Sequence, residues 1–329
     1  MLIFSPAKIR KLPQMIQEPI KQYTPQTNTI NPFLQFLTIT GVTVGLVIVF
    51  SAIAAGVIMA VFGMKTLTDT FAFNTGNPHL GSALWILQIV STTIPLFLAP
   101  VIFARLIMNN TRDYLKPSFN FNPVFLLLIF TIMLFSNPIM EALTNINQKL
   151  VLPASLKGLE EWMRAAEQSA QRATKAMLSM KNIWSMLWAV FVVGLLTAIA
   201  EEFLFRGVIQ TIFVRLTKNK HAAIWITAIL FSAFHMEFFT FLPRVFLGAI
   251  FGYFVAYSGS IWTGVWGHFL NNGSAVVITY LYNQKIVKLN PDDQHVFNLW
   301  AYAFSLIIVL FLLFIYRNVS IQKKPALSN

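Results

Sequence analysis

Three charged side chains lie within an apolar run at residues 183–216, in the stretch AIAEEFLFRGVIQ. They are Glu201, Glu202 and Arg206. A charged side chain at the centre of a bilayer costs about 2.5–3.5 kcal/mol on insertion scales, so all three must be paired or used. Glu202 and Arg206 are four residues apart and can pair on one helix face. Glu201 is rotated by about 100° from Glu202, which leaves its carboxylate free either for chemistry or for a buried ion network that fixes helix packing.

Two later apolar runs each add a histidine. Phe231 precedes His235 by four residues, and His268 precedes Asn272 by four, so each pair shares a helix face. A single histidine in a membrane helix more often makes an interhelical hydrogen bond than binds a ligand. Glu201 and His235 are both about 21–23 Å from the inner ends of their runs, and His268 is shallower. Because isolated polar groups are costly in a membrane, we expect the carboxylate, the imidazoles and the amide to line one cavity.

This combination of side chains suits the hydrolysis of a peptide bond. A carboxylate beside an imidazole can hold and deprotonate water. A second imidazole and an amide donor can stabilise the oxyanion that forms when water adds to the carbonyl. The sequence therefore predicts amide hydrolysis within the membrane. The other three histidines, His79, His221 and His295, fall in loops or at the edges of apolar runs, and no role is assigned to them.

The composition requires that many helices be surrounded by lipid. Hydrophobic residues make up 56% of the 329 residues, charged residues only 11%, and the mean hydropathy is +0.65. The net charge of +12 fits the collection of Lys and Arg in cytoplasmic loops of a membrane protein, and no basic stretch with interleaved aromatics suggests nucleic-acid binding. The absence of cysteine excludes disulfides and Cys-ligated metals, so any metal must be held by His and carboxylate.

The predicted fold is an all-α, polytopic membrane helix bundle with about eight transmembrane helices. A crossing needs about 20 apolar residues. The expected spans are residues 33–63, 82–108, 122–142, 183–216, 221–242, 244–258, 260–281 and 298–316. The run at 183–216 is much longer than one bilayer requires, which predicts a tilt, a break or an extension beyond the membrane.

The chain divides into five expected regions. Residues 1–31 form a cytoplasmic tail, residues 32–142 the N-terminal spans, residues 143–182 an amphipathic extramembrane helix and loop, residues 183–281 the catalytic core, and residues 282–329 the last span with a basic tail. The distribution of Lys and Arg places both termini in the cytoplasm. The short basic tail and the lack of a cysteine-rich domain favour a bacterial cytoplasmic membrane.

The motifs Glu-Glu-x-x-x-Arg at 201–206, Phe-x-x-x-His at 231–235 and His-x-x-x-Asn at 268–272 resemble, in order and spacing, those of the CPBP family. This family contains the CAAX prenyl endopeptidases and the bacterial Abi proteins, which process bacteriocins or confer immunity to them. The resemblance covers about residues 183–281. It implies that Glu201 activates water with His235 as its partner, that His268 and Asn272 stabilise the oxyanion, and that Glu202 and Arg206 hold Glu201 in place.

The resemblance leaves the cofactor and the substrate open. Glu201, His235 and His268 could ligate a divalent metal such as zinc with one open position, or glutamate-activated water could suffice without a metal. The family implies a membrane protein or a lipid-anchored peptide as substrate, either a prenylated CAAX tail or a bacteriocin leader. No nucleic-acid partner is expected, and the oligomeric state is not readable.

Two other functions stay open. A catalytically silent membrane scaffold or immunity protein would keep the same motifs for packing alone. A proton- or ion-coupled transporter would use Glu and His as a charge relay. The inverted repeat expected of many transporters is missing from the sequence.

Overall fold

The computed structural model describes residues 30–291, 293 and 295–322, and every regular element in these ranges is helical. The predicted all-α fold is therefore confirmed. The predicted tail at 1–31 and the basic C-terminal end lie almost wholly outside the described residues. The α-helices are α1 (Pro32–Phe62), α2 (Met64–Phe71), α3 (Leu80–Ile86), α4 (Ile94–Ile102), α5 (Thr111–Leu115), α6 (Val124–Gln148), α7 (Lys157–Met177), α8 (Ile183–Ala189), α9 (Thr197–Glu202), α10 (Gln210–Thr217), α11 (Lys220–Phe234), α12 (Phe241–Ser258), α13 (Ile261–Asn283) and α14 (Leu299–Gln322).

Short segments of other helix types join or interrupt these elements. The π-helical segments are Leu87–Thr93, Phe103–Ile107, Val190–Leu196 and Phe203–Ile209, and the 3-10 turns are Ala154–Leu156 and Phe238–Thr240.

Six helical stretches in the described part of the chain are long and apolar enough to cross a membrane, which supports an integral membrane protein. They are Pro32–Phe62, Leu80–Ile107, Val124–Gln148, Ile183–Thr217, Phe238–Ser258 and Leu299–Ile321. The predicted count of about eight is not confirmed. α11 has 15 residues and spans about 22 Å, short of the roughly 30 Å of hydrocarbon. α13 has 23 residues, but its His, Asn and Gly residues lower its hydropathy and it is not among the six.

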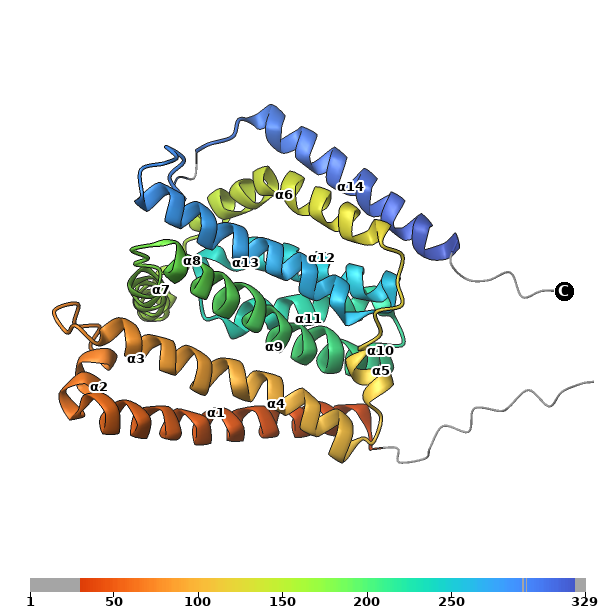
Figure 1. Cartoon of the computed structure of the whole chain (residues 1–329). Helices are drawn as coiled ribbons and strands as arrows, with labels where there is room; N and C mark the ends of the chain where they lie inside the picture. The colour runs from red at the N-terminus through yellow and green to blue at the C-terminus, as the bar shows by residue number, and fades with distance from the viewer. Residues whose placement is uncertain (1–29, 292, 294, 323–329) are drawn as a thin grey trace, which may run out of the picture. The chain divides into compact units, whose positions relative to one another are not determined.

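The helices of the predicted catalytic core lie in the middle of the bundle. Figure 1 shows α1 and α4 along one side, α6 and α14 along the other, and α9, α11, α12 and α13 between them. In the most apolar 18-residue stretch of each span, the buried share is 61% for the span that contains α12, but only 11% for α1 and 17% for α14. The outer helices therefore present most of their apolar surface to lipid, while α12 packs on protein.

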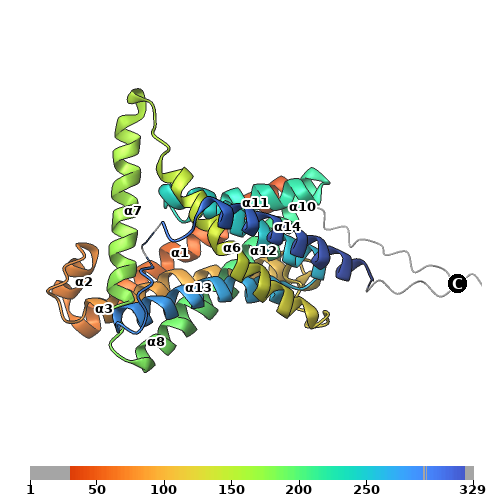
Figure 2. The ribbon, with the colours of Figure 1, turned by 90° about the horizontal axis from the view of Figure 1, so that it is seen from above.

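Helix α7 runs across one end of this bundle. It is seen end-on in Figure 1 and along its length in Figure 2. It packs against α3 and against the 3-10 turn before α12. On α7, Met163, Ala166 and Ala170 are half-buried, whereas Leu159 near its start is exposed, as is Leu156 just before it. α7 is a helix within the region 143–182, and the placement of that region outside the membrane stays a prediction.

The long run that starts at residue 183 is one helical rod of 35 residues, with no break between Ile183 and Thr217. α8, α9 and α10 are joined in it by the π-helical segments Val190–Leu196 and Phe203–Ile209. π-Helical turns widen the backbone and are frequent at functional sites. α9, which carries the two adjacent glutamates, lies between the two segments.

Candidate active site

Glu202 and Arg206 form a fully buried ion pair. Both side chains have 0% exposure, and Arg206 Nη1 donates to Glu202 Oε1 at 2.8 Å. The pairing expected from the four-residue spacing is therefore present. Arg206 Nη2 also donates to the carbonyl of Gly248 on α12 at 3.1 Å, and the guanidinium lies 4.3 Å from the centroid of the Phe231 ring. The arginine consequently ties the rod that bears the glutamates to both α11 and α12.

The same glutamate orients His268 on α13. His268 Nδ1 lies 3.0 Å from Glu202 Oε1, and its ring stacks on Phe251 with centroids 5.1 Å apart. Because Arg206 keeps Glu202 paired as a carboxylate, which can only accept, His268 Nδ1 must carry the proton of this hydrogen bond. Nε2 of His268 then faces away from Glu202, toward Glu201.

Glu201 is the point on which the two imidazoles converge. Its Oε2 lies 3.7 Å from His268 Nε2 and 3.8 Å from His235 Nε2, and this oxygen is buried without a hydrogen-bond partner. His235 Nδ1 donates to the carbonyl of Phe231 at 2.8 Å, so its Nε2 is free to accept a proton. These distances are too long for direct hydrogen bonds.

Asn272 lies one helical turn beyond His268 on α13, turned toward the π-helical segment 190–196. Its amide Nδ2 donates to the carbonyl of Val193 at 3.2 Å, and its Oδ1 accepts from Asn271 at 3.1 Å. The structure thus brings Glu201, His235 and His268 together directly, with Glu202 and Arg206 behind them. Asn272 is on the adjacent turn, with one Nδ2 hydrogen left to donate.

Two residues that the sequence did not single out hold the turn that follows His235. Asn147 of α6 donates to Phe238 O at 2.8 Å and accepts from Leu242 N at 2.7 Å. Glu167 of α7 accepts from Phe239 N at 2.8 Å, and burial raises the pKa of this carboxyl. Both side chains are buried. In the sequence, Asn147 could have been noticed as a polar residue that follows an apolar run. No sequence feature distinguishes Glu167 from the charged residues near it.

Gly264 on α13 provides the space that Glu202 occupies. A Cβ at this position would lie 2.7 Å from Glu202 Oε2 and 2.7 Å from a methyl carbon of Val255. We expect Gly264→Ala to lower the free energy of unfolding by about 1–3 kcal/mol, because the ion-paired carboxylate cannot yield without losing its partners. Thermal unfolding of the protein in detergent measures this loss. Gly45→Ala on α1 is the matched control, since a Cβ there meets nothing within 4 Å. Equal stability of the two variants would contradict this view of Gly264.

The sequence predicts that Glu201, His235 and His268 could ligate a metal. Within the residues that the structure describes, no group of three or more His, Asp or Glu side chains is arranged so that it could hold a metal ion. The assignment of Glu201, His235 and His268 as metal ligands stays a prediction.

One comparison with known proteins bears on this site. Residues 183–274 match the family described as type II CAAX prenyl endopeptidase Rce1-like. No curated protein and no solved structure matches the chain. The matched region runs from α8 into α13 and confirms the resemblance inferred from the three motifs. It includes all six residues of these motifs that were predicted to act in the site, namely Glu201, Glu202, Arg206, His235, His268 and Asn272. Residues 183–274 are therefore similar to the Rce1-like family of type II CAAX prenyl endopeptidases.

Proposed function

We propose that the protein is an intramembrane endopeptidase that uses a water activated by Glu201. The observation that carries this proposal is the buried, unpartnered Oε2 of Glu201, which faces the Nε2 atoms of His235 and His268 at 3.8 and 3.7 Å. A water in this position can donate one hydrogen to Glu201 and the other to His235, with its lone pairs free to attack a carbonyl carbon.

In the proposed reaction, the water oxygen bonds to the peptide carbonyl carbon while Glu201 takes one water proton. The carbonyl oxygen becomes an oxyanion. Glu201 then gives the proton to the amide nitrogen as the carbon–nitrogen bond breaks and the carbonyl re-forms, which leaves a carboxylic acid and an amine. Glu202 takes no proton in these steps and stays paired with Arg206.

The oxyanion needs donors, and His268 and Asn272 are the proposed ones. His268 already donates through Nδ1 to Glu202, so it can donate through Nε2 only as an imidazolium. Asn272 can donate the Nδ2 hydrogen that its bond to Val193 leaves over. Donors of this kind are effective because they are fixed in place before the charge develops.

Asn272→Ala is expected to lower kcat by about 10²–10³-fold without preventing membrane insertion, as for the loss of one oxyanion donor. Single-turnover cleavage of a bound peptide measures the chemical step. Asn271→Ala is the matched control, because Asn271 donates to Asn272 and not to the proposed reaction centre. If both variants cleave at the rate of the native protein, Asn272 has no part in the mechanism.

We propose a membrane-associated peptide as the substrate. The family description suggests a prenylated tail, and a peptide anchored by a prenyl group would reach a site enclosed by membrane helices from within the lipid. The test uses full-length protein in lipid vesicles with a farnesylated CAAX peptide and with the same peptide lacking the lipid. Mass spectrometry of the products identifies any cleaved bond. Cleavage of the farnesylated peptide by the native protein, and not by Glu201→Gln, supports the proposal.

Failure to cleave either peptide would redirect the search to other substrates. Peptides from membranes of cells that carry native or Glu201→Gln protein would then be compared. If no peptide differs between the two, the proposed protease activity is wrong, and the scaffold interpretation replaces it.

A further inference from the structure

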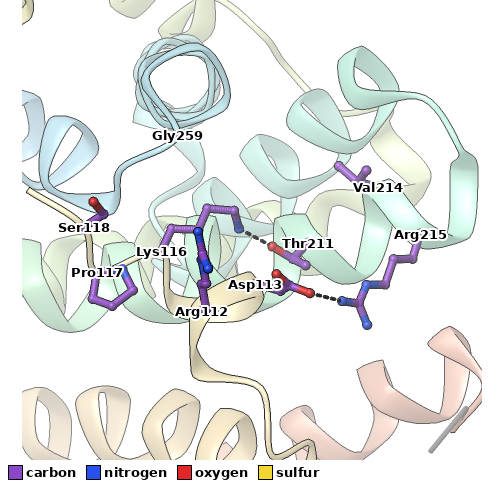
Figure 3. A pocket seen from close by; sticks show the side chains of 9 residues that line it. All are labelled: Arg112, Asp113, Lys116, Pro117, Ser118, Thr211, Val214, Arg215 and Gly259. Atoms are coloured by element: carbon purple, nitrogen blue, oxygen red, sulfur yellow. Dashed lines mark hydrogen bonds and ion pairs between the residues drawn. The ribbon is translucent and has the colours of Figure 1, made fainter. Parts of the chain in front are cut away.

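A second polar site lies at the opposite end of the bundle from α7. It is a pocket of about 540 Å³ between the segment that follows α5, the outer face of α10 and the turn between α12 and α13. Arg112, Lys116, Thr211 and Arg215 are among the side chains that line it (Figure 3). None of these residues belongs to the proposed active site.

The charges in the pocket are unbalanced. Arg215 is satisfied, because it lies 3.7 Å from Asp113 and donates to the Tyr114 hydroxyl at 2.6 Å. Lys116 donates to the hydroxyl of Thr211, and no carboxylate lies within ion-pair distance of it in the described part of the chain. Arg112 likewise has no ion pair with any described residue and is exposed. Two cations therefore face the pocket, and its single acid is already engaged by Arg215.

Hydrogen bonds from α13 hold the basic wall in position. The carbonyl of Lys116 accepts from Ile261 N at 3.0 Å, the carbonyl of Pro117 accepts from Trp262 Nε1 at 3.0 Å, and the carbonyl of Ser118 accepts from Ser260 Oγ at 2.5 Å. Three consecutive carbonyls are thus fixed to the start of one helix. The backbone that carries Lys116 is ordered before any ligand binds, which lowers the entropic cost of binding.

The surroundings of the pocket are those of a membrane–water boundary. Phe119 is 70% exposed and stacks on Trp262 with ring centroids 4.6 Å apart. Leu216, at the end of α10, is also exposed. Exposed aromatic side chains next to cations are typical of the level at which lipid headgroups lie. A ligand here can present an anion to the pocket and a hydrocarbon chain to the lipid.

We propose that this pocket binds a phosphate group, of the kind that an anionic lipid headgroup carries, between Arg112 and Lys116. Arginine supplies a planar pair of donors to phosphate and lysine a point charge, and basic pockets at the ends of membrane helices suit such headgroups. Burial lowers the pKa of Lys116 to about 8, and a bound anion would offset this cost. The proposal does not depend on the protease activity.

The experiment uses full-length protein, freed of lipid in detergent. Native mass spectrometry measures binding of phosphatidylglycerol, with phosphatidylcholine, a zwitterionic lipid without net charge, as the comparison, and calorimetry measures binding of inorganic phosphate. We expect Arg112→Gln to weaken phosphatidylglycerol binding by about tenfold, as for the loss of one charge-assisted hydrogen bond. Arg112 is exposed, so this variant should fold normally. Arg317→Gln is the matched control, since Arg317 is exposed on α14 and does not line the pocket.

The outcomes separate the two sources of phosphate. Weaker binding of the lipid alone assigns the pocket to a headgroup, and weaker binding of inorganic phosphate alone assigns it to a soluble phosphate compound. The proposal is overturned if Arg112→Gln binds both ligands as tightly as native protein, or if Arg317→Gln loses as much affinity as Arg112→Gln. A second variant, Lys116→Gln, must also weaken binding of the ligand whose affinity Arg112→Gln lowers.

Discussion

Glu201→Gln is expected to lower the rate of peptide hydrolysis by about 10²–10⁴-fold, the usual contribution of a positioned general base. The amide keeps the size of the side chain but cannot take a proton from water. The ion pair of Arg206 is with Glu202 and not with Glu201, so the substitution leaves this buried pair intact. We therefore expect normal thermal unfolding of the variant, together with retained binding of the substrate peptide.

The matched control for this prediction is Glu161→Gln on α7. It makes the same chemical change on a carboxylate whose side chain is 68% exposed and pairs only at the surface with Lys157. Cleavage rates of the two variants are compared in the same vesicles. If Glu201→Gln cleaves as fast as Glu161→Gln, Glu201 does not activate the water, and the proposed mechanism fails.

Arg206→Ala is expected to lower the free energy of unfolding by about 3–5 kcal/mol, because it leaves Glu202 as an uncompensated charge in a buried site. It also removes the bond to the Gly248 carbonyl and the contact with the Phe231 ring. Loss of activity should follow, since Glu202 then no longer holds His268 in one orientation. Thermal unfolding and cleavage, measured on the same preparation, check both effects.

Arg164→Ala provides a matched control with the same helical spacing. Arg164 pairs with Glu160 four residues earlier, but its side chain is 47% exposed, and surface pairs of this kind contribute about 0–1 kcal/mol. The double variant Glu202→Gln with Arg206→Met should recover part of the stability lost in Arg206→Ala, because it removes both charges. A stable but inactive Arg206→Ala protein would indicate instead that Arg206 contacts the substrate.

The number of membrane-spanning helices could not be predicted from apolar runs alone. Apolar runs predicted helices at nearly all the observed places, because hydrophobicity and helix length follow directly from residue type. The runs at 221–242 and 260–281 were expected to cross the membrane. α11 ends at Phe234, where Asn147 and Glu167 hold the following turn, and α13 carries polar residues that the bundle interior accommodates. Neighbouring helices satisfy these polar groups, and the hydropathy of a single sequence segment carries no information about those neighbours.

By itself, the sequence determined the local part of the site. The four-residue spacing places Glu202 beside Arg206, and the adjacent position turns Glu201 away, because both relations follow from the helical period alone. Only the tertiary structure decided that His268 bonds to Glu202 at 3.0 Å and lies 3.7 Å from Glu201, across 66 residues of chain. It also placed Arg112 and Lys116 in a pocket with Arg215. These contacts depend on how separate helices pack, and packing is set by the shapes of many side chains together, which the spacing of a few residues along one helix does not contain.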